Sequence, residues 1–185
     1  MLKWAFDTFV ALLLLGFLLP ILALVALAIK WDSKGSIIYK QIRVGRYGKE
    51  FGIYKFRSMV ANADQIGGYF TTEGDARITK VGAFLRKTSL DELPQIINVL
   101  LGDMSLVGPR PDVPAQKKNY TQQDWDKRNS VRPGITGLAQ ATVRSQAKPN
   151  ERTRLDLEYV DKQSFWFDVK VLLLTVKQVL GKGSF

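Results

Sequence analysis

An adjacent pair of carboxylates, Asp91 and Glu92, is the part of this sequence best suited to chemistry. The chain contains no histidine and no cysteine. Acid–base or covalent chemistry must therefore come from carboxylates, lysines, hydroxyls or a metal ion that they hold. Many arginines accompany the pair, and guanidinium groups bind phosphate well. These residue types predict chemistry on a substrate that carries phosphate.

The same pair also fits an ordinary helix start. Ser89 and Glu92 have the spacing of a capping box, and Asp91 could itself cap the helix, with Pro94 tolerated in the first turn. The amides of a helix N-terminus would also lower the pKa of a carboxylate and keep it ionised beside a phosphate. An ionised aspartate can attack phosphorus, while its neighbour binds a metal or takes a proton. The spacing alone leaves both interpretations open.

Composition favours phosphate-bearing partners and a hard metal ion. The formal net charge of the 185 residues is +10, of which residues 1–34 contribute +1 and residues 35–185 contribute +9. A surface this basic attracts nucleic acid, nucleotides or anionic lipid. Without cysteine the chain forms no disulfides or thiolate metal sites. Without histidine it also lacks the usual zinc ligands, so an oxygen-bound ion such as Mg²⁺ is the expected metal.

An uncharged apolar segment, residues 9–29, lies near the N-terminus. As a straight helix it would be roughly 30 Å long, enough to cross a bilayer, and no cleavage motif follows it. Proline near its centre predicts a kink between Gly16 and Pro20. Length favours a helix that spans the membrane, whereas the proline and the flanking Lys3 and Lys30 favour a re-entrant helix. Physical arguments alone leave both topologies open.

The rest of the chain alternates short amphipathic segments with turns. Helical and strand periodicities, together with glycines and prolines, set the expected boundaries. The expected elements are strands at 37–39 and 51–57 around a turn at 44–49, a surface loop at 62–76, helices at 78–86, 93–101 and 116–129, an irregular stretch at 104–114, and a helix in 162–181 that is either core or interfacial.

Arginines next to prolines or glycines are candidate phosphate ligands. Arg110 lies between two prolines that restrict the backbone around its guanidinium. Arg132 opens a segment in which glycines permit close backbone approach to a ligand. Any single arginine could also be a solvated surface charge. The candidates are Arg57, Arg86, Arg110, Arg132 and Arg144.

Taken together and in order, the motifs resemble the bacterial sugar transferase family, the monotopic phosphoglycosyl transferases, in its small form. The resemblance covers nearly the whole chain. The motifs that carry it are KFRSM at 55–59, LRKTSLDELPQ at 85–95, NVL at 98–100, GDMS at 102–105, GPRP at 108–111 and VRPGITGLAQ at 131–140.

This resemblance implies an enzyme that moves a sugar-1-phosphate from a UDP-sugar to undecaprenyl phosphate and releases UMP. It implies that Asp91 is the nucleophile, forms a covalent phosphosugar and binds Mg²⁺, and that Glu92 is the partner carboxylate assisting the acceptor phosphate. It also implies a set of phosphate-contacting or basic residues. These are Lys55, Arg57, Arg86, Arg110, Arg132 and Arg144.

The resemblance also implies a fold and a location. We expect a mainly helical α+β protein with a re-entrant membrane segment at residues 1–32 and a catalytic domain at residues 33–185. The catalytic domain would contain a small β-hairpin and amphipathic interfacial helices. The protein would lie in the bacterial cytoplasmic membrane with this domain on the cytoplasmic face, and would start a surface glycan or glycoprotein pathway without binding nucleic acid.

Two other functions compete with this one. A non-enzymatic, membrane-anchored basic module that binds anionic lipid would explain the charge and the apolar segment, but not the carboxylate pair or the proline-flanked arginine. A metal-dependent lipid phosphatase or pyrophosphatase would use the same residue types without a sugar donor. Neither the identity of the sugar nor the oligomeric state follows from the sequence.

Overall fold

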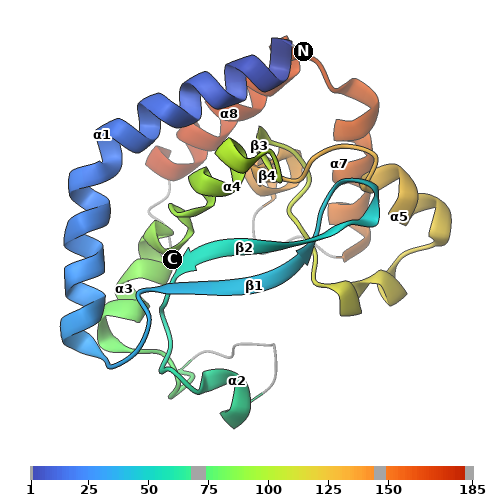
Figure 1. Cartoon of the computed structure of the whole chain (residues 1–185). Helices are drawn as coiled ribbons and strands as arrows, with labels where there is room; N and C mark the ends of the chain where they lie inside the picture. Colours follow the sequence, from blue (N-terminus) through green and yellow to red (C-terminus); the bar gives the residue numbers. More distant parts are fainter. Residues whose placement is uncertain (1, 68–73, 144–148, 182–185) are drawn as a thin grey trace.

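The computed structural model describes residues 2–67, 74–143 and 149–181 of the chain (Figure 1). Helices predominate, and two small two-stranded sheets accompany them, which confirms the expected mainly helical α+β class. In chain order the elements are α1 (Leu2–Asp32), β1 (Ile38–Val44), η1 (Arg46–Gly48), β2 (Glu50–Phe56), α2 (Ala63–Ile66), α3 (Lys80–Thr88), η2 (Leu90–Glu92), α4 (Gln95–Leu101), β3 (Ser105–Val107), η3 (Pro114–Asn119), α5 (Gln122–Arg128), β4 (Gly134–Thr136), α6 (Leu138–Thr142), α7 (Pro149–Lys162) and α8 (Phe165–Gly181).

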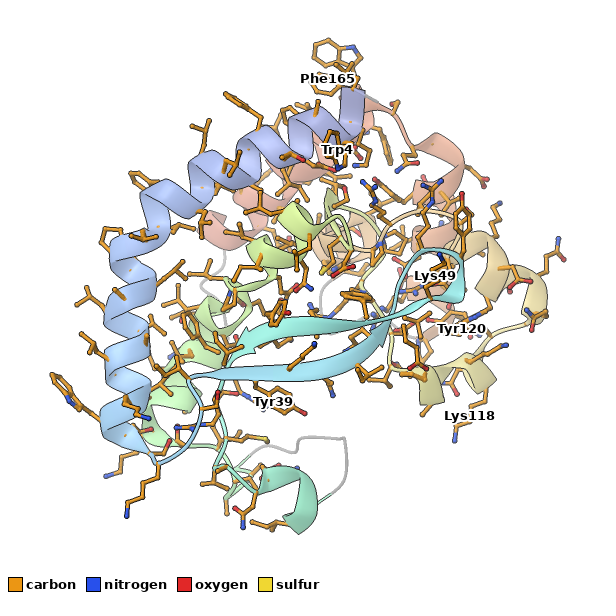
Figure 2. All side chains as sticks on the ribbon, in the orientation of Figure 1. Trp4, Tyr39, Lys49, Lys118, Tyr120 and Phe165 are labelled. Atoms are coloured by element: carbon orange, nitrogen blue, oxygen red, sulfur yellow. The ribbon has the colours of Figure 1, made fainter. Side chains whose placement is uncertain are left out.

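Helix α1 bends near its middle and encloses one side of the molecule (Figure 1). Pro20 lies inside the helix, where it removes a backbone hydrogen bond, so the bend agrees with the expected kink. The helix is long and apolar enough to cross a membrane. Its most apolar 18-residue stretch has a mean hydropathy of 3.0, and only 11% of that stretch is buried. Many of its side chains project outward with no other element beyond them (Figure 2). An apolar surface this large is typical of a site that contacts a membrane or another protein, and no described element of the chain packs over it.

Strands β1 and β2 form the expected hairpin. They pair antiparallel from Ile38 opposite Phe56 to Val44 opposite Glu50. The connecting turn is closed by a hydrogen bond from the Gly45 amide to the Lys49 carbonyl, 2.7 Å long. The first strand is longer than residues 37–39, because pairing with β2 continues to the turn. The hairpin confirms the prediction and extends it.

The second sheet is a short parallel pair within a stretch expected to be irregular. β3 pairs with β4 through Ser105 opposite Gly134 and Val107 opposite Thr136. The expectation for residues 104–114 was therefore wrong at its start, where a distant partner supplies the strand pairing. The backbones pack so closely that a Cβ on Gly134 would lie 2.1 Å from the amide nitrogen of Gly108. Only glycine fits at position 134. The chain that leaves the end of β3 at Gly108 therefore packs directly against the backbone of β4.

The remaining helices agree with the sequence pattern in part. α4 begins two residues later than expected and ends, as expected, at Gly102, whose φ of +84° suits glycine. The last apolar segment forms α8, with Asp168 and Val171 buried and Trp166 exposed. Residues 62–76, expected to be a loop, include the short helix α2. Helix α7 was not predicted, because residues 149–162 are mostly polar and have weak periodicity.

Two hydrophobic clusters hold these elements together, and α1 contributes to both. The larger one joins Ala11 of α1 to residues of β2, α4, β3, α6, α7 and α8. The smaller one packs Val25 and Ile29 of α1 against Phe56 of β2 and Leu85 of α3. The two halves of the bent helix thus contact the same globular unit at separate places.

Candidate active site

The carboxylate pair lies in a tight turn between two helices. α3 ends at Thr88, its C-cap Ser89 has a left-handed φ of 58°, and the chain then forms the 3₁₀ turn η2. The side chain of Ser89 makes no capping hydrogen bond, and Pro94 is the N-cap of α4. Both oxygens of Glu92 bind side chains from other elements. The interpretation of this pair as a helix cap was therefore wrong.

Glu92 is held by two cations from different parts of the chain. Lys55 Nζ, on β2, donates to Glu92 Oε1 at 2.7 Å. Arg110 donates to both carboxylate oxygens, with Nη1 3.2 Å from Oε2 and Nη2 on Oε1. This bidentate geometry is the strongest arrangement for a guanidinium and a carboxylate. We refer below to Lys55, Glu92 and Arg110 as the ion triad.

The ion triad fixes the charge of Glu92. Burial alone would raise the pKa of this carboxyl, but the charges of Arg110 and Lys55 outweigh burial and hold the pKa well below its ordinary value of 4.5. Glu92 is therefore ionised at any physiological pH, with its oxygens already occupied. It is placed to hold the two cations, and it does not have the free lone pairs of a general base.

The pKa values of the two cations shift in opposite directions. Burial lowers the pKa of Lys55, and the charge of Arg110 lowers it further, while Glu92 raises it. For Arg110, the charge of Glu92 is the largest influence and raises the pKa despite burial. Glu92 is thus what keeps a desolvated lysine charged beside an arginine. Without it, two like charges would face each other in a poorly hydrated place.

Asp91 has the opposite environment from its neighbour. Within the described ranges of the chain, no hydrogen bond or ion pair reaches its carboxylate. Burial raises its pKa above the ordinary 3.8, Glu92 raises it further, and the charges of Lys55, Arg86 and Arg110 oppose the rise. The result is a carboxylate more basic than usual, with free oxygens, next to several cations. Such a group can act as a nucleophile towards a phosphate-bearing molecule.

The other predicted arginines differ in position. Arg86 Nε donates to Ser58 Oγ at 2.9 Å, and the charge of Arg86 acts on Asp91. Arg57 binds a different part of the chain: its Nη2 donates to the carbonyl and hydroxyl of Ser33 at 2.7 and 2.9 Å. Arg132 precedes β4 and has no side-chain contact to the pair among the interactions of the described residues. Arg144 lies outside the described residues.

A small hollow beside the ion triad is lined in part by two residues, Arg43 and Gln95, that were not among the predicted site residues. Its lining residues are Arg43, Ile53, Lys55, Gln95, Arg110 and Pro111. Gln95 is buried, and its Nε2 has no hydrogen-bond partner. Arg43 was missed because the first strand was expected to end at residue 39. The longer hairpin brings it opposite Phe51 and beside the triad.

A larger hollow lies elsewhere. It is lined by residues of η3, α5 and α7, among them Tyr120, Leu157 and Lys162. None of its lining residues belongs to the ion triad or the carboxylate pair. Its charged groups pair locally, as in the contact of Lys162 with Glu158 at 2.7 Å.

A metal ion would find one free carboxylate here. The described residues contain no group of three or more acidic side chains able to hold an ion. Glu92 is engaged by the triad, so Asp91 is the carboxylate with oxygens to offer. Magnesium commonly takes one or two protein carboxylates, with substrate phosphates and water completing its shell. The donor set therefore fits a magnesium ion that binds together with a phosphate-bearing substrate.

Comparison with known proteins identifies the family. The model of the family described as "Bacterial sugar transferase" matches residues 1–182, so the chain belongs to that family.

Three relatives illustrate its range. The Escherichia coli K12 protein named UDP-glucose:undecaprenyl-phosphate glucose-1-phosphate transferase is 45% identical over 193 residues, covering 100% of this chain and 42% of the relative. The Aeromonas hydrophila UDP-N-acetylgalactosamine-undecaprenyl-phosphate N-acetylgalactosaminephosphotransferase is 40% identical, covering 98% and 44%. The Rhizobium leguminosarum bv. phaseoli exopolysaccharide production protein PSS is 41% identical, covering 99% and 97%. The chain thus spans about two fifths of the length of the first two relatives and nearly all of the third.

The ion triad makes a prediction about Lys55. Replacing Glu92 with glutamine (Glu92→Gln) removes the charge that raises the pKa of Lys55, so that pKa should fall further below its ordinary value of 10.5. The measurement is an NMR titration of ¹³C-dimethylated lysines, with the Lys55 signal assigned by its loss in Lys55→Arg. Glu50→Gln, an exposed carboxylate on the same strand, is the matched control and should leave the signal unchanged. An unchanged Lys55 titration in Glu92→Gln would contradict the triad.

Proposed function

We propose that this chain transfers a sugar-1-phosphate from a UDP-sugar to undecaprenyl phosphate and releases UMP. The observation that carries the proposal is Asp91, a carboxylate without a partner among the described residues, beside a cluster of cations that Glu92 organises. The family, and the names of relatives that act on UDP-sugars and undecaprenyl phosphate, support the choice of substrates.

The proposed reaction has two displacements at one phosphorus atom. In the first, an Asp91 carboxylate oxygen attacks the phosphorus attached to the sugar. The bond from that phosphorus to the bridging oxygen breaks, and its electron pair leaves with UMP. In the second, a phosphate oxygen of undecaprenyl phosphate attacks the same phosphorus. The bond to Asp91 breaks, which restores the carboxylate and yields an undecaprenyl diphosphate sugar. The chain itself needs no net proton transfer in either step.

Charge neutralisation is the main task of the surrounding residues. Attack of an anion on a diphosphate is opposed by repulsion, and preformed cations reduce that barrier because they need no reorganisation. Lys55 and Arg110 are held by Glu92, and the charge of Arg86 acts on Asp91. We propose that Lys55, Arg86 and Arg110 bind the phosphates of donor and acceptor in turn. Substrate contacts from Arg57, Arg132 and Arg144 stay predictions.

Glu92 has two possible roles in this scheme. The resemblance implied that it assists the acceptor phosphate, and the geometry supports a positioning role for its carboxylate, which holds Lys55 and Arg110.

We propose that Asp91 also contributes an oxygen to a Mg²⁺ ion that binds with the diphosphate. When bound, this ion would supply further neutralisation of the phosphate charge.

We further propose that α1 is a re-entrant helix. At its N-terminal end, Lys3 Nζ donates to the Val107 carbonyl at 3.2 Å, and Ser105 Oγ donates to Asp7 Oδ2 at 2.7 Å. At the other end, the Val81 amide donates to Asp32 Oδ2 at 3.0 Å. Both ends are thus tied to one globular unit. A helix that spans the bilayer would separate them by about 30 Å of hydrocarbon, so these contacts favour entry and return through one face.

This topology gives the chain its proposed location. Residues 1–32 would be embedded in the cytoplasmic membrane, and residues 33–185 would form the catalytic domain on its cytoplasmic face. Amphipathic α8, with Trp166 and Leu173 exposed, is a candidate interfacial helix. Since undecaprenyl phosphate is confined to the bilayer, anchoring the enzyme there restricts the search for the acceptor and helps to orient it.

Asp91→Asn tests the proposed reaction. The substitution keeps the size of the side chain and removes its nucleophilic charge, so UMP release from UDP-sugar plus undecaprenyl phosphate should fall by at least about 10³-fold. The measurement is a UMP assay on purified enzyme across UDP-glucose, UDP-galactose and UDP-N-acetylgalactosamine. Asp126→Asn, at an exposed position on α5, is the control and should retain full activity.

The competing functions give different results in the same experiment. A lipid-binding module would release no UMP in wild type and would bind anionic vesicles equally well after Asp91→Asn. A phosphatase would release inorganic phosphate from undecaprenyl phosphate without any sugar donor. Full UMP release by Asp91→Asn would contradict the proposed nucleophile.

Cysteine labelling tests the topology directly, because the natural chain has no cysteine. Leu2→Cys and Lys34→Cys place single thiols at exposed positions before and after the apolar segment. A re-entrant helix predicts that a membrane-impermeant maleimide labels both in inside-out vesicles and neither in spheroplasts. Asp126→Cys, on the exposed side of α5, marks the face of the globular unit. Labelling of the two thiols from opposite sides would establish a spanning helix.

A further inference from the structure

The segment that carries Arg110 has no regular secondary structure, yet its backbone is held at every carbonyl from Pro109 to Asp112. The Gly134 amide donates to the Pro109 carbonyl at 3.0 Å, and the Val44 amide donates to the Asp112 carbonyl at 2.9 Å. The two carbonyls between them accept from side chains. Arg128 Nη2 donates to the Arg110 carbonyl at 2.5 Å, and Arg43 Nη1 donates to the Pro111 carbonyl at 3.0 Å.

Arg128 is the more buried of the two side-chain donors, and each of its guanidinium nitrogens points at a different acceptor. Its side chain is 1% exposed. Nε donates to Asp156 Oδ2 at 2.9 Å, Nη1 lies 3.0 Å from Asp112 Oδ2, and Nη2 binds the Arg110 carbonyl. The ring of Tyr120 faces the guanidinium carbon at 5.5 Å, and its hydroxyl donates to Asp112 Oδ2. We refer to Arg128, Asp112 and Asp156 as the buried anchor.

A buried anchor of this kind is a poor device for stability alone. Removing charged groups from water costs several kcal/mol per ion, and well-packed apolar side chains of the same volume often stabilise a protein as much or more. What ion pairs and forked hydrogen bonds provide is one defined orientation. A guanidinium can serve three acceptors that lie in different directions in its plane, which an ammonium group on a flexible stem cannot do in the same geometry.

We propose that Arg128 is a positioning residue for the transfer reaction, acting on Glu92 and Asp91 through Arg110. The buried anchor fixes the backbone of Arg110. The guanidinium of Arg110 is therefore already directed at both oxygens of Glu92. Arg128 itself touches neither carboxylate of the pair in any described contact. This inference rests on the proposed function for its link to catalysis, whereas the positioning of Arg110 can be measured separately.

The test is Arg128→Lys, which keeps the positive charge and loses the fork. If the anchor positions Arg110, kcat/KM for UMP release should fall by about 10–100-fold, the order expected for a shift of about an ångström in a catalytic group. In an Arg110→Ala background, the same substitution should cost less than about 3-fold. An equal loss in both backgrounds would overturn the proposal, since Arg128 would then act independently of Arg110. Arg154→Lys, at a largely exposed position on α7, is the matched control and should have no effect.

A second readout does not depend on activity. The charge of Arg110 lowers the pKa of Lys55, so displacing Arg110 should raise that pKa in the dimethyl-lysine titration. If wild type releases no UMP but Arg128→Lys still shifts the Lys55 titration, the proposed function fails and the positioning of Arg110 stands. If wild type is active and neither readout changes, the inference fails alone. Should Arg128→Lys not fold, Asp156→Asn decides the question: it should shift both readouts in the same direction by less, and no shift would overturn the proposal.

Discussion

The ionic bond between Glu92 and its two cations is the interaction on which the rest of this site depends. It joins β2, the η2 turn and the segment after β3, which are far apart in the sequence. Each must be held rigidly for the three charges to meet. The hairpin positions Lys55, the left-handed Ser89 starts the turn, and the parallel β3–β4 pair with its buried anchor positions Arg110. These elements together position the two cations that bind the Glu92 carboxylate.

That arrangement gives two adjacent carboxylates opposite properties. Glu92 is engaged by two cations, and its pKa lies far below the ordinary value. Asp91 has no partner among the described residues, and burial raises its pKa. Pairs of titratable groups whose environments push their pKa values apart are typical of catalytic sites. In the proposed mechanism, the engaged carboxylate concentrates positive charge, and its free neighbour forms the bond to phosphorus.

The sequence predicted the features that depend on local chemistry. The hairpin, the end of α4 at Gly102 and the bend in α1 follow from turn residues, glycine and proline, and the carboxylate pair was recognisable from residue types alone. Long-range contacts were not predictable in the same way. Nothing near Arg128 indicates that its partner is the Arg110 carbonyl, and nothing near Arg57 indicates that it binds Ser33. Such pairings depend on which distant segments pack together, because polar groups that become buried there are hydrogen-bonded to whatever partner lies within reach.

The most direct test of the central claim is the mass of the intact protein after exposure to a UDP-sugar and Mg²⁺ without any lipid acceptor. We expect the correct donor to add the mass of one sugar phosphate to wild type, peptide mapping to locate the adduct at Asp91, and Asp91→Asn to stay unmodified. Added undecaprenyl phosphate should remove the adduct. A wild-type enzyme that turns over donor and acceptor, yet never carries the adduct under conditions that trap it, would contradict the covalent role of Asp91.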